Sequence, residues 1–229
     1  MSILRIDQLD YHAASDDKGE GFRLSVDQFT MFAGDKVAIV GPSGAGKTTL
    51  LNLIAGTIKA QSGDIKLLGK STQNLSASEL DSVRGRHLGV VFQSLNLLPF
   101  ASAQHNVTVA GSFSAERRKR GRGTEQSLLK ALGLDLNTLA SRRPVQQMSV
   151  GQQQRIAAAR ALYGAPDLIL ADEPTSALDA ENRDRFLALL LDALDASRQA
   201  ILVVTHDMAL ARRFDRVISM EALTSGQSQ

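Results

Sequence analysis

Hydrophobic residues along the chain form short, nearly continuous runs in some segments and recur at helical spacing in others. Continuous runs of this length are typical of buried parallel strands. They occupy residues 36–40, 87–93, 168–174 and 200–205. Helical spacing is clearest in residues 49–55, which Gly56 closes, and in residues 180–197, which Asp179 caps. This succession predicts an α/β fold with a mainly parallel sheet flanked by helices.

Two regions depart from this pattern. Residues 3–9 and 22–30 alternate between apolar and polar positions around the polar stretch 13–21, which predicts an antiparallel hairpin. Residues 94–165 instead have helix-like spacing. We therefore expect one domain with an N-terminal antiparallel β subdomain and an inserted helical subdomain. The core is expected to comprise about 1–93 and 166–229, and the insert about 94–165.

Residues 41–48 lie between the first continuous run and the first helix, and they fit the phosphate-binding pattern G-x-x-x-x-G-K-S/T. Glycine is needed in such a loop because side chains would block the approach of backbone N–H groups to phosphate oxygens. Lys47 is expected to reach the β- and γ-phosphates, and Thr48 to offer its hydroxyl to Mg²⁺. The predicted nucleotide-binding residues of this segment are Gly41, Pro42, Ser43, Gly44, Ala45, Gly46, Lys47, Thr48 and Thr49.

Two carboxylates stand at the end of the apolar run 168–174. Because neighbouring residues of a strand face opposite sides of the sheet, we expect Asp172 and Glu173 to have different roles. In phosphate-loop enzymes an Asp at this position holds Mg²⁺. Glu173 is then free to orient and deprotonate water.

Single polar residues end two other strands. His206 follows the run 200–205, and it is either a structural strand-end residue or a group that holds the γ-phosphate or the attacking water. Gln93 ends the run 87–93. It is either a solvated polar residue or the source of a carbonyl oxygen for a metal or for water.

A second candidate anion site precedes a helix expected over about 153–162. Ser149 and Gln152 form the capping-box pattern S-x-x-Q, with Gly151 between them. These residues are either an ordinary helix start or, because a serine hydroxyl and free N–H groups suit an anion, a phosphate site.

Tyr11 and the basic stretch 116–122 each allow two interpretations. Tyr11 is either a strand-end aromatic, which the pattern alone favours, or a ring on which adenine stacks. The basic stretch is expected to be a solvated helix end, with a phospholipid or partner contact as the alternative. It lacks interleaved aromatic residues, which makes nucleic acid an unsuitable ligand.

The length, charge and composition of the chain are typical of a globular domain, and they give no indication of a nucleic-acid-binding, membrane-spanning or secreted protein. The chain has 229 residues, of which 43% are hydrophobic, and this suits one domain with a substantial core. A formal charge of +2 gives no reason to expect nucleic acid. No apolar run approaches the ~18 residues of a membrane span, and the N-terminus lacks the pattern of a signal peptide, so we expect a cytoplasmic protein. The absence of cysteine excludes disulfides.

Taken together, these motifs resemble those of the ATP-binding cassette ATPases over essentially the whole chain. Six motifs occur in the order typical of that family, which makes the resemblance specific. Residues 41–48 resemble Walker A, 91–93 the Q-loop, 148–152 the signature, 168–173 Walker B, 176–179 the D-loop, and His206 the switch histidine.

The resemblance implies an ATPase that uses Mg²⁺. It implies that two copies of the chain, or the chain and a homologous ATPase, sandwich two ATP molecules, so that each phosphate loop faces the signature residues Ser149, Gly151 and Gln152 of the other subunit. It assigns adenine stacking to Tyr11, the general base to Glu173, and metal binding to Thr48, Gln93 and Asp172. Gln93 would also link the metal to an integral membrane permease, with the protein peripheral on the inner face of the cell membrane.

The signature departs from the common sequence L-S-G-G-Q. Met148 and Val150 replace its leucine and its first glycine, whereas Ser149 and Gly151 keep the positions that face phosphate in the family. A β-branched residue is acceptable in a first helical turn, so we expect activity with some steric penalty.

Within the family, residues 41–44 and 92–99 resemble the lipoprotein-release and macrolide-efflux branch. This implies a motor for a membrane permease, and an alternative is a regulator that pulls on a membrane partner to control a cell-wall enzyme without transport. The segment 95–101, with Leu97, Leu98 and Phe100 expected to be exposed, is the candidate docking surface for the partner.

Overall fold

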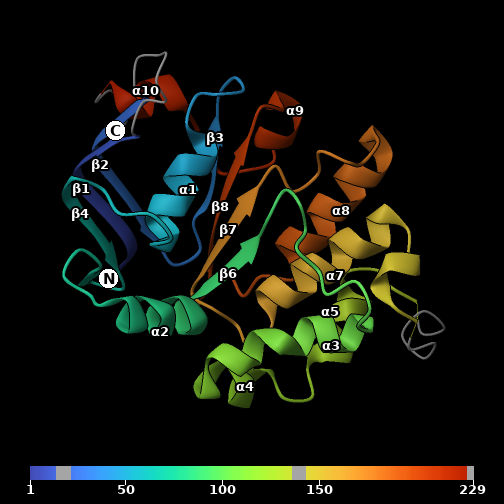
Figure 1. The fold of residues 1–229 in the computed structure, drawn as a ribbon. Coiled ribbons are helices and arrows are strands. Elements are labelled where there is room, and N and C mark those ends of the chain that lie inside the picture. Colours follow the sequence, from blue (N-terminus) through green and yellow to red (C-terminus); the bar gives the residue numbers. More distant parts are fainter. Residues whose placement is uncertain (14–21, 136–142, 226–229) are drawn as a thin grey trace.

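The structure is a computed structural model that describes residues 1–13, 22–135 and 143–225, so most of the stretch between the two N-terminal strands lies outside it. A five-stranded parallel sheet in the order β6-β7-β8-β3-β9 forms its centre (Figure 1). Its strands are β3 (Lys36–Val40), β6 (Leu88–Val91), β7 (Leu168–Asp172), β8 (Ala200–Thr205) and β9 (Arg216–Ser219). Each predicted apolar run contains one of these strands, which confirms the parallel sheet.

A second, antiparallel sheet has the order β2-β1-β4-β5. Its strands are β1 (Ser2–His12), β2 (Arg23–Phe32), β4 (Ser62–Leu67) and β5 (Lys70–Ser71). β1 and β2 pair antiparallel, with Ile6 opposite Phe29, so the predicted hairpin is confirmed. The α/β fold with an antiparallel N-terminal sheet is therefore the predicted one.

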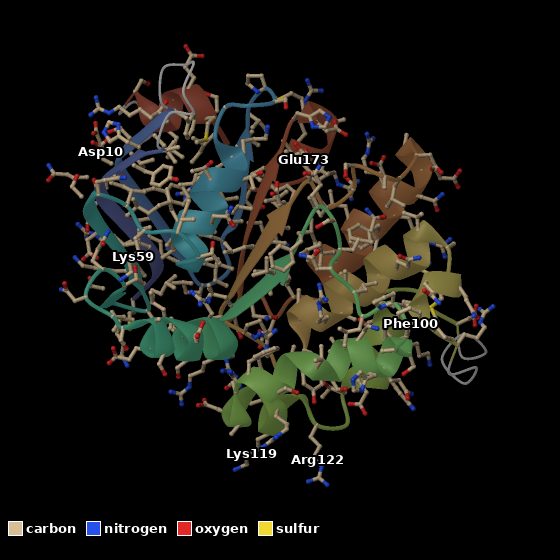
Figure 2. The ribbon with its side chains drawn as sticks, in the orientation of Figure 1. Asp10, Lys59, Phe100, Lys119, Arg122 and Glu173 are labelled. Carbon is tan, nitrogen blue, oxygen red and sulfur yellow. The ribbon has the colours of Figure 1, made fainter. Side chains whose placement is uncertain are left out.

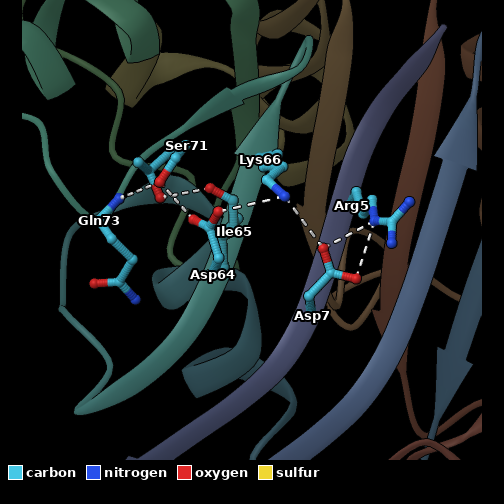
Figure 3. Close-up of polar contacts among 8 residues, drawn as sticks. Arg5, Asp7, Asp64, Ile65, Lys66, Ser71 and Gln73 are labelled. Carbon is cyan, nitrogen blue, oxygen red and sulfur yellow. Dashed lines mark hydrogen bonds and ion pairs between the residues drawn. The ribbon is translucent and has the colours of Figure 1, made fainter.

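Charged and polar side chains link the strands of the antiparallel sheet (Figure 3). Asp7 of β1 accepts a hydrogen bond of 2.8 Å from Arg5, and it lies 3.5 Å from Nζ of Lys66 on β4. Lys66 is also 3.6 Å from Asp64, which accepts a hydrogen bond of 2.6 Å from Ser71 of β5. Because these groups are partly exposed, they contribute little to stability and mainly favour this strand register.

The helices lie on both faces of the parallel sheet, as Figure 1 shows. The longer ones are α1 (Lys47–Ala55), α2 (Ala77–His87), α7 (Val150–Leu162) and α8 (Ala180–Asp192). The shorter ones are α3 (Ala103–Thr108), α4 (Ala115–Gly121), α5 (Glu125–Ala131), α9 (Met208–Ala211) and α10 (Met220–Thr224), with single 3₁₀ turns at Val109–Phe113 and Val145–Gln147.

Alternate residues of the parallel strands point to opposite faces and build two separate hydrophobic cores. On one face Val203 packs with residues of α7 and α8, among them Ile156 and Phe186. On the other face Leu202 packs with α1 and the antiparallel sheet. The sheet is thus covered on both sides, which explains why β3, β6, β7 and β8 are continuous apolar runs, whereas the edge strand β9 is partly exposed.

Two helices differ from the sequence-based prediction. The helix expected over residues 180–197 ends at Asp192, because residues 193–199 form a turn held by side chains. There Gln199 accepts a hydrogen bond from the Asp195 amide, and Asp195 accepts one from the Ser197 hydroxyl. α2 was not predicted, since Leu80 and Gly85 are its buried residues, although Ser76 and Glu79 form a complete capping box at its start.

The prediction that the basic stretch 116–122 is a solvated helix end is wrong for Arg117, which is 4% exposed. Its guanidinium donates hydrogen bonds to the carbonyl oxygens of Tyr163, Leu88 and Ala161 at 2.6, 2.6 and 2.7 Å. Burial lowers the pKa of Arg117 to about 10. α4 therefore points Arg117 inward while Arg118 and Lys119 remain exposed.

Candidate functional site

A cavity of about 650 Å³ opens at the carboxyl ends of the parallel strands, which is where ligands bind in sheets of this kind. The phosphate loop follows β3, Gln93 follows β6, Asp172 ends β7 and His206 follows β8. Figure 2 labels Glu173 at this end of β7. The described residues that line the cavity are Phe22, Pro42, Ser43, Gly44, Gly46, Lys47, Thr48, Thr49, Gln93, Asp172, Glu173 and His206.

The phosphate loop leads directly into α1. Gly46 precedes the helix with φ of 91°, and a Cβ built on it would lie 2.4 Å from the ring of Phe22, so only glycine fits. In the described structure no side chain caps the first turn of α1. Its N–H groups and the positive end of the helix dipole are therefore available to an anion in the cavity.

Lys47 is buried, with 7% of the residue exposed, and its ammonium group points back along the loop. Nζ donates hydrogen bonds to the carbonyl oxygens of Gly41 and Pro42 at 2.8 and 2.9 Å, and it lies 3.8 Å from a Glu173 carboxylate oxygen. The carbonyl bonds satisfy a charge that would otherwise be costly to bury. They also hold the cation at the cavity wall, where phosphate oxygens can replace them.

Asp172 has the environment of a metal ligand. It is 8% exposed, and burial raises its pKa, while the nearby Thr48 hydroxyl acts in the opposite direction. Within the described residues, its Oδ1 is buried without a hydrogen-bond partner. A buried, unpaired carboxylate oxygen next to a hydroxyl suits a hard cation such as Mg²⁺, which prefers oxygen ligands. The residues present therefore fit the expected metal.

The carboxylate of Glu173 is held by three donors. Oε1 accepts the His206 backbone N–H at 2.9 Å and lies 2.8 Å from His206 Nδ1, and Oε2 accepts the Thr205 hydroxyl at 3.0 Å. These contacts fix the orientation of the carboxylate. Thr205 was not among the predicted site residues.

Asp172 and Glu173 line one cavity, although we expected them to point to opposite sides. β7 ends at Asp172, and Glu173 has a φ of 44°, in the left-handed region, so the strand alternation does not continue through it. Their contacts nevertheless differ: Asp172 lies near Thr48, and Glu173 contacts Thr205 and His206.

Among the described residues, Tyr11 does not line this cavity. It is partly buried, and it packs against the core beneath the antiparallel sheet. The aromatic ring at the cavity is Phe22, directly before β2, which sequence reasoning missed. An aromatic residue at the start of the second predicted strand was the available signal. The adenine-stacking role of Tyr11 stays a prediction.

The signature residues lie at the start of α7 and, in the described part of the chain, do not line the cavity. Ser149 and Gln152 form the predicted capping box, with hydrogen bonds of 3.3 Å from the Gln152 amide to the serine Oγ and 3.0 Å from the Ser149 amide to the glutamine Oε1. The side chain of Val150 is exposed. The serine oxygen thus serves the helix start, and its proton remains available to a further acceptor.

A second hollow, of about 800 Å³, separates α2 from the helices that follow Gln93; we name it the α2 groove. Its described lining residues are Ser78, Asp81, Ser82, Arg84, Gly85, Val90, Phe92, Asn96, Leu98, Val109, Ala110, Phe113, Arg117, Arg160 and Ala161. Phe92 lines the α2 groove, whereas the next residue, Gln93, lines the nucleotide cavity. The two hollows are therefore joined by one peptide unit.

Arginines connect the walls of the α2 groove to the segments that carry the site. Arg84 donates a hydrogen bond of 2.7 Å to the carbonyl of Gly56, at the end of α1. Arg160 donates to the carbonyls of Leu95 and Asn96 at 2.6 and 2.5 Å. Leu95 and Asn96 both have positive φ values, so Arg160 holds an unusual turn just after Gln93.

Comparison with known proteins gives consistent matches. The profile of the ABC transporter family matches residues 24–176. The chain is 41% identical over 191 residues to the macrolide export ATP-binding/permease protein MacB of Rhodopseudomonas palustris, an alignment that covers 83% of this chain and 28% of that protein. The chain thus spans less than a third of the length of this relative.

Two further matches cover most of both chains. The ABC transporter ATP-binding protein YbbA of Escherichia coli is 38% identical over 198 residues, which is 86% of this chain and 83% of that protein. The dimeric post-hydrolysis structure of the ATP-binding cassette MJ0796, bound to ADP and Pi, superposes with a TM-score of 0.78 at 32% identity and covers 97% of this chain and 95% of that one.

None of the described helices has the length and apolar character needed to cross a bilayer. The predicted motifs, the fold around the cavity and the matched family profile agree. The chain therefore belongs to the ABC transporter family, and it is an ATP-binding and ATP-hydrolysing cassette of that family.

Proposed function

We propose that the chain is the motor subunit of a transporter of the lipoprotein-release or macrolide-efflux type, acting as a dimer on the inner face of the membrane and driving an integral membrane permease. One observation carries this proposal: the adjacent residues Phe92 and Gln93 line the α2 groove and the nucleotide cavity, respectively. A partner seated in the groove would contact Phe92, and the peptide bond from Phe92 to Gln93 would transmit a movement of the partner to the nucleotide cavity. The resemblance to the MacB export protein supports the branch.

In this proposal, the phosphate loop and Lys47 hold the ATP phosphates, and Mg²⁺ is held by Thr48, Asp172 and Gln93. A Mg²⁺ ion bound there would neutralise charge on the β- and γ-phosphates. Binding requires Lys47 to exchange its two carbonyl hydrogen bonds for phosphate oxygens, which form stronger, charge-assisted bonds.

Glu173 takes a proton from the attacking water, and Thr205 and His206 keep its carboxylate facing the cavity. His206 also lines the cavity, and its Nδ1 contacts Glu173, so in this proposal it orients the base and is available to hold the γ-phosphate or the attacking water. Positioning of this kind lowers the barrier because the base needs no rearrangement at the moment of reaction.

The site is completed by a second copy, or by a homologous ATPase, whose Ser149, Gly151 and Gln152 face the γ-phosphate. The exposed start of α7, with free room above Gly151, suits such a contact: a Cβ built on Gly151 has only Leu178 near it, at 3.7 Å. The dimeric form of the related MJ0796 cassette supports this arrangement.

The docking surface for the permease is the α2 groove together with the segment 95–101. Leu98 is 43% exposed at the groove wall and Phe100 is 79% exposed beside it. Leu97, which we also expected to be exposed, is partly buried against the core. The buried Asn106 fixes this segment, because its side chain accepts the Leu98 amide at 2.7 Å and donates to the Leu98 carbonyl at 3.1 Å. In this proposal, residues 94–135 and 143–165 move with the partner as one unit.

The test is partner-dependent ATP hydrolysis. We expect the isolated cassette to be mostly monomeric and slow, because two polar phosphate-facing surfaces bury little apolar area. The permease holds two copies together and raises their effective concentration, hence turnover. Leu98→Glu and Phe100→Glu should abolish this stimulation and leave basal hydrolysis intact.

Phe32→Glu is the matched control, since Phe32 is also an exposed aromatic, 52% exposed, but lies at the end of β2. It should leave both rates unchanged. If basal and stimulated rates fall together in the Leu98 and Phe100 variants, these residues support the fold and the docking assignment is wrong. A fast, stable dimer of the isolated cassette would contradict the motor role.

A further inference from the structure

The basic residues of α4 divide into an inward set and an outward set. Arg117 is buried and bonds only to backbone carbonyls, as described above. Arg120 donates a hydrogen bond of 3.2 Å to the carbonyl of Arg86 at the end of α2, and the Arg86 side chain forms an ion pair with Glu116. These contacts fasten α4 to α2 and to the core on either side of the α2 groove.

Close backbone packing fixes α4 further. A Cβ built on Gly121 would lie 2.5 Å from the ring of Tyr163, so the end of α4 rests directly on that aromatic ring. A Cβ on Gly85 of α2 would lie 2.6 Å from the carbonyl oxygen of Phe113, which precedes α4. The helix therefore has a defined orientation, and its outer face is a fixed feature of the surface.

That end of α4 carries the exposed residues Arg118 and Lys119, and the exposed Arg122 follows it directly. Across residues 1–13, 22–135 and 143–225, none of the three side chains forms a hydrogen bond or an ion pair. Arg118 and Lys119 lie in the last turn of α4, and Arg122 follows its last residue, Gly121, so the three cations gather at the C-terminal end of the helix. Figure 2 shows Lys119 and Arg122 pointing away from the body of the molecule along the same edge.

This cationic end of α4 adjoins the proposed docking surface. Phe113, which is 71% exposed, lies directly before α4 and also lines the α2 groove. If an integral membrane permease occupies the groove, α4 is carried to the surface of the bilayer. The position of α4 at the bilayer therefore rests on the proposed function.

We propose that Arg118, Lys119 and Arg122 form a binding surface for anionic phospholipid headgroups beside the permease. The three cations are unpaired and solvated, so they meet a negatively charged leaflet without breaking internal contacts. In the described structure they line neither the nucleotide cavity nor the α2 groove, which suits a diffuse layer of headgroups better than one enclosed anion. The hydrogen bonds of Arg117 and Arg120 fix the orientation of α4, so that all three cations can contact the leaflet together.

The experiment is co-sedimentation of the cassette with lipid vesicles. One set contains phosphatidylcholine alone, and the other contains about one-third phosphatidylglycerol, which gives an anionic surface. The test variant is Arg118→Gln, Lys119→Gln and Arg122→Gln together. The control is Lys59→Gln, Arg212→Gln and Arg213→Gln, which removes the same charge from exposed positions outside α4.

We expect wild type and control to bind the anionic vesicles, and the test variant to bind them about 100-fold more weakly at low salt, given about fivefold per lost cation. Binding of the wild type should fall as salt is raised, because exposed charges are screened. Neutral vesicles should bind none of the proteins. Thermal unfolding of the two triple variants should match wild type, since the substituted side chains are exposed.

Equal weakening in test and control would overturn the proposal, because it would mean attraction by net charge alone. Absence of wild-type binding to anionic vesicles would also overturn it. A third result against it is loss of permease-stimulated ATPase by the test variant in detergent without anionic lipid, which would assign α4 to the protein partner. Failure of the docking proposal can be told apart from failure of the lipid proposal. If only the docking proposal fails, Leu98→Glu keeps permease-stimulated ATP hydrolysis, and the wild-type cassette still binds anionic vesicles.

Discussion

The nucleotide cavity and the α2 groove lie on either side of one peptide unit, between Phe92 and Gln93, yet they are built differently. In the cavity, functional side chains at strand ends bond to one another and to the loop, as Lys47, Glu173 and His206 do. In the groove, arginine side chains bond to backbone carbonyls of distant segments. The first arrangement holds charged and polar groups where a small ligand can bind them. The second connects segments that are far apart in the sequence.

This difference separates the expected effects of substitution. Changes in the cavity should alter ATP binding or hydrolysis with little effect on folding. Changes to the groove arginines should alter stability or coupling and leave the chemistry of an isolated site largely unchanged. The predictions below follow from that contrast, in order of decreasing effect.

Glu173→Gln should lower the rate of ATP hydrolysis by about 100- to 10,000-fold, because an amide cannot accept the proton of water. ATP affinity should stay near wild type, and the variant should accumulate as an ATP-bound dimer. Single-turnover hydrolysis and size-exclusion chromatography with ATP measure the two effects. Turnover close to wild type would show that another group is the base.

Lys47→Ala should weaken ATP binding by about 100-fold or more, because the phosphates lose a buried cation that forms charge-assisted hydrogen bonds. Equilibrium titration with ATP measures the affinity. Lys59→Ala, at an exposed position, is the control and should bind ATP normally. Unchanged affinity in the Lys47 variant would contradict the phosphate-loop assignment.

Arg117→Met should lower the free energy of unfolding by about 3 kcal/mol, because several buried carbonyl oxygens lose their donor. The exposed neighbour supplies the control: Arg118→Met should change stability by less than about 0.5 kcal/mol. Urea unfolding measures both. Equal stability of the two variants would mean that Arg117 contributes no more than a surface residue.

Val150→Gly tests the departure in the signature. Val150 is 50% exposed in the first turn of α7. In the proposed dimer its methyl groups would crowd the partner's nucleotide without removing a phosphate donor. The substitution should raise ATP-dependent dimerisation modestly. Glycine also lowers the stability of the helix by about 1 kcal/mol, which opposes this gain. A rise in turnover by orders of magnitude would instead mean that the native signature is degenerate.

The sequence by itself determined the parallel sheet and the residues at its carboxyl edge. Four of its five strands are largely buried and apolar, so each was visible as a run, and the polar residue that follows it was conspicuous. The edge strand β9 was not predicted, because its residues are partly exposed and show no continuous apolar run. The glycines and lysine of the phosphate loop were visible because phosphate binding restricts residue type at fixed spacing. The N-terminal hairpin was likewise determined by its alternating pattern.

Only the tertiary structure decided the features that depend on contacts between distant segments. Arg117 looks like its basic neighbours in the sequence, and its burial follows from carbonyl groups of β6 and α7 that come together around α4. Phe22 lies at the cavity because β2 places it over Gly46. Thr205 contacts Glu173 because β7 and β8 are adjacent and parallel. Such contacts leave no local pattern, since the partner of each residue lies far away in the chain.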